Sequence, residues 1–194
     1  MAPAKLDLYA EHRDEYVAPR EPVLVDVGPA RYLAIAGRGK PGGAEFAAAV
    51  GALYTVSFSV KMASKAAGSD YAVSKLEGLW WKEGSSVEWS WKLLIRIPEF
   101  ITGKHITAAV TKLLERNKDE TVSQVTLQTL DEGKCVQMLH VGPYTAEQST
   151  LAKMRAFAKQ HGLSFDGRHH EIYLSDPRRI EADKLRTILR QPVR

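Results

Sequence analysis

Cysteine is nearly absent from this sequence, and its absence limits the possible chemistry. Cys135 is the one cysteine among 194 residues, which excludes an intrachain disulfide and a cysteine-based metal cluster. Because chains without disulfides are typical of reducing compartments, we expect a cytoplasmic location. No activating pattern surrounds Cys135, so we predict a buried structural side chain and not a nucleophile.

Long hydrophobic runs and targeting patterns are also missing. We find no run of about 18 apolar residues, the length of a membrane-spanning helix, so we expect no membrane partner. The first residues, MAPAKLDLYAEHRDEY, are charged and lack the apolar centre of a signal peptide. The stretch GRGKPGG at 37–43 lacks the Gly-Lys-Ser/Thr ending of a phosphate-binding loop.

A strong charge of one sign is absent as well. The chain has 27 Lys and Arg against 23 Asp and Glu, a net charge of +4, and the two signs are interleaved. This balance is typical of a solvated basic surface. Without a helix-turn-helix pattern, zinc-finger spacing or an arginine-rich arm, we expect no direct nucleic-acid partner. With 44% hydrophobic residues, the composition is that of an ordinary globular protein.

Hydrophobic periodicity divides the chain into strands and helices. Helical spacing predicts helices over 44–67, about 103–117 and 145–161, with Thr102 as an N-cap and Gly162 as a C-terminal stop. Runs rich in β-branched residues predict strands at 23–39, 71–81, 87–98, 122–130, 135–142, 168–175 and 187–193. Residues 1–22 are polar and are expected to form a peripheral arm.

Two passages of the sequence run in the same order. Strand, turn, helix, strand and returning strand occur at 31–97 and again at 135–193, and aligning them places Gly37 on Gly142 and Glu77 on Glu171. The pattern predicts an α+β fold of duplicated strand–helix–strand–strand modules, with antiparallel sheets in a pseudo-twofold arrangement around a central ligand cleft. We therefore expect an arm (1–22) and one domain (23–194), with repeat one over about 23–98, a connecting helix over about 103–117 and repeat two over about 122–194.

The aromatic residues are unevenly placed. All 4 tryptophans lie between Trp80 and Trp91, and LEGLWW at 76–81 sets Glu77 beside two of them. HHEIYLSDP at 169–177 sets Glu171 in a similar context. Because alternate side chains of a strand face opposite sides, one face of this second stretch carries His169, Glu171 and Tyr173. The other face is more apolar and is expected to pack beneath a helix; it carries His170, Ile172 and Leu174.

A carboxylate among aromatic walls has two uses. It can bind flat or cationic ligands by stacking, cation–π attraction and charge pairing. With its pKa raised by desolvation, it can also move protons or orient a water. Alternatively, either glutamate faces solvent or pairs with an arginine; the candidates are Arg178, Arg179 and Arg190.

A metal site is a weaker interpretation of the same region. His140, His169, His170 and Glu171 offer ligand types that suit zinc or iron. Adjacent histidines in a strand point opposite ways, however, so only one of the pair can share the face of Glu171. We expect no metal and no other cofactor.

Several motifs together resemble the stand-alone GyrI-like small-molecule-binding proteins over nearly the whole chain. They are GALYTVSFSVKM, LEGLWW, QMLHVGPY and HHEIYLSDPRR. The resemblance implies two modules with a ligand cleft between them, a fold shared with the effector-binding domains of multidrug-responsive regulators. There a pocket glutamate meets cationic aromatic drugs, and Glu171 stands at the matching place. Some stand-alone members resemble hydrolases that open the cyclopropane ring of DNA-alkylating natural products.

The sequence departs from the family pattern at two places. We see no DNA-binding segment before residue 23, so direct control of transcription is not expected. GKP at 39–41 stands where an acidic residue before the proline is expected, so this turn differs from the family pattern.

Two functions follow from these observations. The first is binding of hydrophobic, flat or cationic xenobiotics, for detoxification or sequestration, by a monomer or weak dimer. The second is hydrolysis of cyclopropane-bearing electrophiles, with Glu171 as general base and Tyr173 or His140 as helper. A protein-binding adaptor is a third alternative and would expose a large apolar patch. Alternation favours Trp81 over Trp80 as a wall of the site; the expected ligand-binding residues are Glu77, Trp80, Trp81, Trp89, Trp91, Tyr54 and His169.

Overall fold

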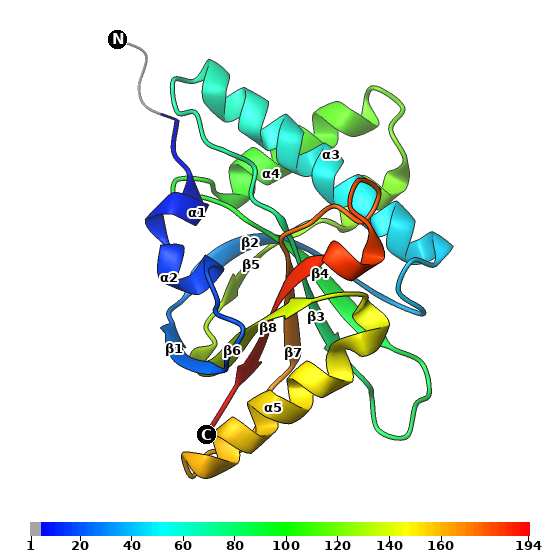
Figure 1. Cartoon of the computed structure of the whole chain (residues 1–194). Coiled ribbons are helices and arrows are strands. Elements are labelled where there is room, and N and C mark those ends of the chain that lie inside the picture. Colours follow the sequence, from blue (N-terminus) through cyan, green and yellow to red (C-terminus); the bar gives the residue numbers. More distant parts are fainter. Residues whose placement is uncertain (1–4) are drawn as a thin grey trace. The chain divides into compact units, whose positions relative to one another are not determined.

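The computed structural model describes residues 5–194, which form eight strands together with α- and 3-10 helices (Figure 1). The chain divides into two compact units. Unit 1 contains residues 5–11, 30–76 and 81–130, and unit 2 contains residues 12–29, 77–80 and 131–194. Every strand pair within a unit is antiparallel. The predicted α+β class with antiparallel sheets is confirmed.

Unit 1 is built on β2 (Ala30–Arg38), which pairs with β4 (Ser90–Arg96) on one side and β5 (Thr126–Leu130) on the other. The long helix α3 (Ala44–Ala66) contacts β2 and β4, and α4 (Gly103–Leu114) packs against α3. The helix α1 (Leu8–Glu11) and the 3-10 helix η1 (Glu120–Gln124) complete the unit. Its core contains Leu33, Leu53, Val56, Leu93 and Ile95, all buried.

The helix α3 is the most apolar element of the chain. By length and composition alone it could cross a membrane. This is weak evidence, because the core helix of a folded domain can meet the same criteria. The expectation that the sequence holds no such stretch is therefore wrong. In unit 1 this helix buries Leu53, Val56 and Val60, whereas Phe58 and Met62 remain 54% and 56% exposed. The absence of a membrane partner stays a prediction.

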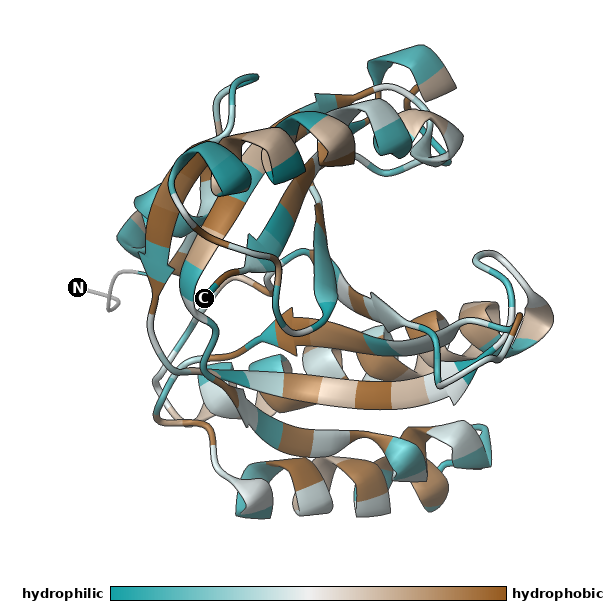
Figure 2. Cartoon of the chain, turned by 90° about the horizontal axis from the view of Figure 1, so that it is seen from below, coloured by the Kyte–Doolittle hydropathy of each residue, from teal (hydrophilic) through white to brown (hydrophobic). Residues whose placement is uncertain are grey.

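Unit 2 has the strand order β1-β6-β8-β7-β3, and its part of β3 is residues 77–80. The helix α5 packs on one face of this sheet, where Met154 and Ala158 contact Val136, Met138 and Leu189. Apolar and polar residues alternate along the strands and around the helices (Figure 2). The strands are β1 (Val23–Val27), β3 (Leu76–Trp81), β6 (Gly133–Val141), β7 (His169–Tyr173) and β8 (Arg186–Pro192). The helices are α2 (Arg13–Tyr16), η2 (Tyr144–Ala146), α5 (Glu147–Gln160) and η3 (Ala182–Lys184).

The order of elements confirms the internal repeat. Strand, helix, strand and strand occur as β2-α3-β3-β4 and again as β6-α5-β7-β8. Each repeat is preceded by a strand that pairs within the other unit, since β1 pairs with β6 and β5 pairs with β2. The pseudo-twofold arrangement and the central cleft stay predictions.

The glycine alignment of the two repeats needs a correction of two residues. Gly39 directly follows β2, and Gly142 directly follows β6; both have positive φ, 106° and 136°. The N–H of Gly39 donates to the carbonyl of Trp89 at 2.8 Å, and that of Gly142 to the carbonyl of Leu185 at 2.9 Å. Gly39, and not Gly37, is therefore the counterpart of Gly142. Both positions use the left-handed conformation that glycine adopts without a steric penalty.

The first part of the chain is not a peripheral arm. Leu8 in α1 and Tyr16 in α2 are buried, with 5% and 3% of their surface exposed. Two predicted strands are also shorter than expected. Tyr71 forms only an isolated bridge with Leu6 before β3 begins at Leu76. The segment before β5 forms η1 because the Asp119 side chain accepts the N–H of Thr121 and caps that turn.

Candidate functional site

The helix α5 covers the face of unit 2 on which Glu171 lies. Glu171 is directly opposite Leu189 in β8, and Leu189 packs against Met154 of α5. His169, Glu171 and Tyr173 share a face, as predicted from alternation. The expectation that His170, Ile172 and Leu174 pack beneath the helix is wrong, because α5 covers the opposite face and His170 contacts buried carboxylates instead.

Three titratable groups meet on the helix-covered face. Glu147 is the first residue of α5, and its ligand atoms lie within 4.8 Å of those of His169 and Glu171. Glu147 is only 7% exposed. The Glu171 and His169 side chains are 13% and 18% exposed, and His169 Nε2 lies 3.5 Å from Glu171 Oε1. We call these three residues, with Trp80, Tyr144 and Tyr173, the acidic site.

Two carboxyl groups this close cannot both ionise cheaply in a buried place. Burial raises the pKa of Glu147 to about 9, and the charge of Glu171 and a hydrogen bond with it act in the same direction. Glu147 therefore carries its proton at neutral pH.

Aromatic side chains surround Glu171. Trp80 Nε1 donates to the Tyr173 hydroxyl at 3.0 Å, and Tyr173 shares a strand face with Glu171. Burial, followed by the charge of Glu171, raises the pKa of Tyr173 well above its usual 10. Tyr144 stands edge-on to Tyr173, with ring centroids 5.8 Å apart, and 37% of Tyr144 is exposed. Tyr173 is thus a neutral phenol at neutral pH and does not act as a base.

Glu77 does not join Glu171. Gly78 is directly opposite Glu171, so Glu77 projects from the other face of the sheet. There its Oε2 lies 3.0 Å from His170 Nε2, and its Oε1 accepts from the Tyr16 hydroxyl at 2.9 Å. The expectation that both glutamates line one cleft is wrong, because they lie on opposite faces of one sheet.

The contacts of Glu77 belong to a larger buried ion network. His170 Nδ1 and Arg190 Nη1 lie 3.0 Å and 3.1 Å from Glu132 Oε2. Although burial opposes it, Glu132 and Glu77 raise the pKa of His170 to about 9. Burial alone would raise the pKa of Glu132, but His170 and Arg190 outweigh it and lower that pKa to about 2. The buried ion network, defined as Tyr16, Glu77, Glu132, His170 and Arg190, therefore holds a charged imidazolium between two carboxylates.

The alternative that a glutamate pairs with an arginine is partly met in this network. Glu77 pairs with His170, and Arg190 joins through Glu132. Arg178 and Arg179 both pair with Asp176 instead.

Four of the predicted aromatic ligand contacts belong to unit 1. Trp91 is fully buried, edge-on to Phe46 at 5.4 Å, and so presents no accessible surface. Trp89 is 40% exposed, and the Lys82 ammonium lies 4.9 Å from its ring. The other two are Tyr54, stacked on Phe58, and Trp81. Trp80, and not Trp81, lies beside Glu171, since Trp80 is directly opposite His169.

His140 and Cys135 are buried in the interior of unit 2. His140 is buried, with Nδ1 2.9 Å from Thr150 Oγ1 and Nε2 3.2 Å from the carbonyl of Pro143. Both ring nitrogens are thus occupied by the chain itself. Cys135 is fully buried, and burial raises its pKa to about 12. The prediction of a structural cysteine is confirmed.

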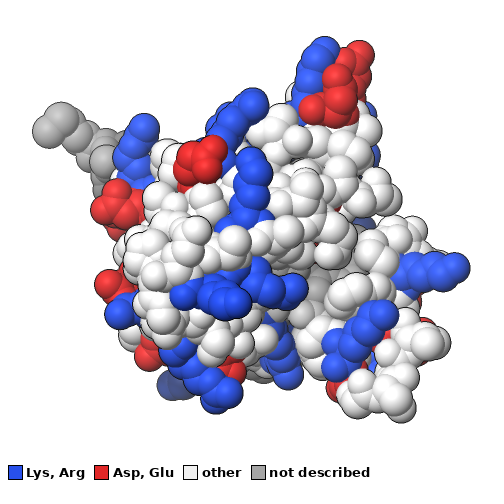
Figure 3. All heavy atoms as spheres, turned by 60° about the horizontal axis from the view of Figure 1, so that its bottom comes forward, with Lys and Arg blue, Asp and Glu red and all other residues white. Residues whose placement is uncertain are grey.

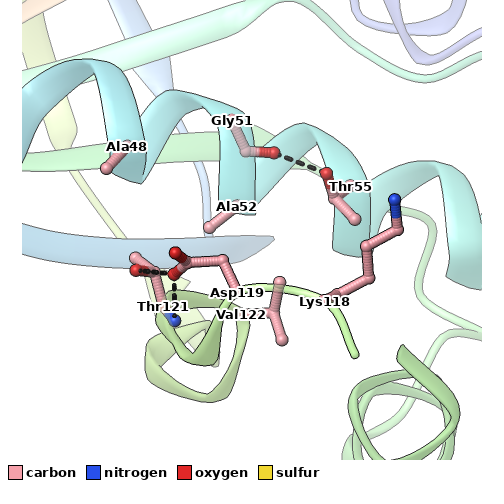
Figure 4. A pocket seen from close by; sticks show the side chains of 8 residues that line it. All are labelled: Ala48, Gly51, Ala52, Thr55, Lys118, Asp119, Thr121 and Val122. Atoms are coloured by element: carbon pink, nitrogen blue, oxygen red, sulfur yellow. Dashed lines mark hydrogen bonds between the residues drawn. The ribbon is translucent and has the colours of Figure 1, made fainter. Parts of the chain in front are cut away.

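A hollow lies in unit 1 between α3 and η1 (Figure 4). Its lining is formed mainly by small residues of α3, and the Asp119 carboxylate that borders it is already bound to Thr121. It therefore offers weaker chemistry than the acidic site. On the face drawn in Figure 3, Lys and Arg are interspersed with Asp and Glu, in keeping with a solvated basic surface.

The sequence patterns do not identify Glu147 as a site residue. An acidic residue in the first turn of a helix is ordinary, because it complements the helix dipole. Only the packing of α5 against the face of β7 reveals that this carboxyl meets Glu171.

Comparison with known proteins agrees with this geometry. The model of the GyrI-like small molecule binding domain matches residues 20–194. The chain belongs to the GyrI-like family. This GyrI-like domain therefore binds small molecules as its family does, which confirms the coarser part of the prediction. No protein with a curated description matches it.

Solved structures show the same fold. An uncharacterized conserved protein from Listeria innocua is 37% identical, with a TM-score of 0.93 over 98% of this chain and 100% of that one. A hydrolase from the same organism is 36% identical, with a TM-score of 0.90 over the same shares. The C-terminal domain of EcmrR is 10% identical, with a TM-score of 0.59 over 90% of this chain and 97% of that one. The last likeness extends to the fold alone.

Proposed function

We propose that the acidic site binds a flat, apolar or cationic small molecule and hydrolyses it, with Glu171 as the base that orients water. The observation that carries this proposal is the setting of Glu171. Its side chain is 13% exposed and shares a strand face with Tyr173, which contacts Trp80 and Tyr144. It is thus a carboxylate at the edge of an aromatic wall.

Binding follows from this composition. Aromatic faces attract flat and cationic molecules, and a carboxylate in a partly desolvated place adds charge pairing. The exposed part of Tyr144 offers the apolar surface for initial contact, and Glu171 offers the polar anchor. We propose xenobiotics as the ligand class and protection of the cytoplasm as the role.

Hydrolysis is favoured by two further points. Trp80 and Tyr173, which are joined by a hydrogen bond, lie on the sheet face of Glu171, and a partly buried carboxylate can take a proton from water. A protein 36% identical over 98% of this chain carries the name hydrolase. Together with the family resemblance, this supports an electrophilic cyclopropane as the group attacked, with addition of water opening the ring.

The test is a turnover assay by mass spectrometry. Wild-type protein and Glu171→Gln are incubated with an electrophilic cyclopropane compound, and a product one water heavier is measured over time. We expect the product with wild type and a rate lower by roughly 10²–10⁴ in the variant. Saturable binding without any product would instead support the second candidate, a sequestering protein. That candidate rests on the small-molecule-binding character of the family.

A further inference from the structure

We propose that the acidic site binds a divalent cation of the zinc type, held by Glu147, His169 and Glu171. The ligand atoms of these three side chains all lie within 4.8 Å of one another. They comprise one imidazole nitrogen and two carboxylate oxygens, and zinc accepts both types of ligand. The binding of a cation does not depend on the proposed hydrolysis, whereas its effect on cationic ligands rests on the proposed function.

Two of the ligands come from one strand. His169 and Glu171 are two residues apart in β7, so their side chains share a face. His169 Nε2 lies 3.5 Å from Glu171 Oε1. From the sequence we expect no metal, because His170 points to the other face and only one histidine remains beside Glu171. One histidine is sufficient, however, when another element supplies the third ligand.

The third ligand is placed by the packing of α5. Glu147 is the first residue of this helix. Leu151, Met154 and Ala158 follow it at spacings of four, three and four residues, so they lie on the same helix face. These apolar residues belong to the core between α5 and the sheet of unit 2. Packing of the apolar stripe therefore holds Glu147 over the sheet face of Glu171.

Several polar atoms of this cluster have no partner in the chain. Glu147 is 7% exposed, and its Oε1 is buried without a hydrogen-bond partner among residues 5–194. Both ring nitrogens of His169 are also buried, and neither has a hydrogen-bond partner in that part of the chain. Buried polar atoms are normally paired, because an unpaired one is destabilising. Three such atoms at one place therefore indicate a ligand that the chain itself does not supply.

The buried ion network has the same types of side chain but does not suit a cation. The two ring nitrogens of His170 each lie 3.0 Å from a carboxylate oxygen, one of Glu77 and one of Glu132. Arg190 adds a further positive charge 3.1 Å from Glu132. The carboxylates of this network are thus neutralised by the chain. The proposal therefore concerns the acidic site alone.

The donor set favours zinc over magnesium and calcium. Mg²⁺ and Ca²⁺ prefer oxygen ligands, whereas an imidazole suits zinc. Zinc lies about 2.0–2.2 Å from nitrogen and oxygen ligands, so the ligand atoms around it are roughly 3–4 Å apart. Small rotations of the three side chains produce this spacing. The partial exposure of His169 and Glu171, 18% and 13%, gives the cation a path of entry.

Zinc at this place competes with a cationic ligand. Glu171 can hold zinc or anchor the ligand, but a dication neutralises the charge that the ligand needs and repels a second positive charge. Zinc also displaces the proton of Glu147, since carboxylates bind metals in their deprotonated form. Zinc should therefore inhibit both dye binding and hydrolysis at the acidic site.

The direct test is calorimetry with ZnCl₂ and chelator-treated protein at pH 7. We expect stoichiometric binding to wild type. Glu147→Gln, His169→Gln and Glu171→Gln should each weaken it by more than roughly tenfold, because losing only the hydrogen-bond partner of a ligand already costs roughly 10–100-fold. MgCl₂ and CaCl₂ should bind far more weakly than ZnCl₂. Melting temperatures show whether each variant is folded.

His12→Gln is the matched control. His12 Nδ1 lies 3.5 Å from Glu15 Oε1, the same separation as that between His169 and Glu171. Within residues 5–194, only the acidic site adds a third metal-ligating side chain to such a pair. His12→Gln should therefore leave zinc affinity unchanged. No zinc binding in wild type, or equal zinc affinity in wild type and the three site variants, would overturn the inference.

Competition in the wild type gives a readout that requires no variant. At a zinc concentration about ten times its dissociation constant, the apparent dissociation constant of a planar cationic dye should rise about tenfold. Unchanged dye affinity at saturating zinc would contradict a cation on Glu171 and overturn the inference. Zinc binding that the site variants lose, in a protein without dye binding or turnover, would reject the proposed function and support the cation site.

Discussion

Glu171 in β7 and Gly78 in β3 are directly opposite each other on adjacent antiparallel strands. The glutamate therefore has no side chain across from it, and the space is used by Trp80 and Tyr173. A Cβ at Gly78 would lie 2.9 Å from Trp80 Nε1 and 3.0 Å from the Tyr173 hydroxyl. The glycine is thus needed for the hydrogen bond between Trp80 and Tyr173.

Gly78→Ala should separate Trp80 from Tyr173 and weaken the site. Forcing a methyl group into a packed place costs about 1–3 kcal/mol, so we expect a lower free energy of unfolding and weaker dye binding. Urea denaturation and a dye titration measure both. Gly51→Ala, at a helical position with open space, is the matched control and should stabilise by up to roughly 1 kcal/mol. Equal behaviour of the two variants would contradict this role of Gly78.

His170→Gln should strongly destabilise unit 2. The change leaves Glu77 and Glu132 buried without the cation between them, and breaking a buried pair costs about 3–5 kcal/mol. Denaturation at pH 6 measures the loss. Lys184→Gln, which breaks an exposed pair with Glu181, should cost at most about 1 kcal/mol. A loss of similar size in both variants would show that the buried ion network contributes little.

Stability should depend on pH with a defined sign. The pKa of His170 is raised from 6.5 to about 9, so its contribution is complete below pH 6.5 and disappears as pH rises through 9. The pKa of Glu132 is lowered from 4.5 to about 2, so its contribution is present above pH 4.5 and disappears as pH falls through 2. The pKa of Glu147 is raised from 4.5 to about 9, so stability falls from pH 4.5 upward on its account.

The free energy of unfolding should therefore be highest near pH 4.5 and fall more steeply above pH 6.5. Denaturant titrations from pH 3 to 9 test this. Glu147→Gln should remove the decline between pH 4.5 and 6.5, while a shallower decline above pH 6.5, due to His170 alone, should remain. A flat profile in wild type would show that neither group changes its pKa on folding.

Trp80 should report ligand binding. It lies beside Glu171 and Tyr173, so a planar cationic dye should quench tryptophan fluorescence with saturation. Trp80→Phe should remove most of the saturable part, whereas Trp91→Phe, in the interior of unit 1, should retain it. The reverse pattern would place the ligand elsewhere.

Local signals in the sequence identify most elements correctly. Thr102 caps α4 as predicted, with its N–H donating to His105 Nδ1 at 3.0 Å, and Gly162 follows α5 with a φ of 71°. The strand–helix–strand–strand order is also visible, because periodicity and turn residues are local properties. The face that His169, Glu171 and Tyr173 share follows from alternation alone.

Sequence patterns do not predict the contacts that depend on tertiary packing. His170 and Arg190 are fully buried, but their polarity says nothing of the carboxylates that neutralise them from distant segments. Sequence patterns therefore predict the wrong side of the sheet for α5 and assign Glu77 to a ligand. They do not reveal Glu147 for the same reason, since no local pattern links a helix start to a strand more than twenty residues later.

The most direct test of the central claim is the affinity of a planar cationic dye for wild type and Glu171→Gln, with melting temperature as the control for folding. The variant keeps the shape of the side chain and removes its charge. If Glu171 anchors the ligand in a partly desolvated site, the loss should be about 2–5 kcal/mol, which is roughly thirtyfold or more in dissociation constant. Unchanged affinity in a variant with an unchanged melting temperature would contradict the account.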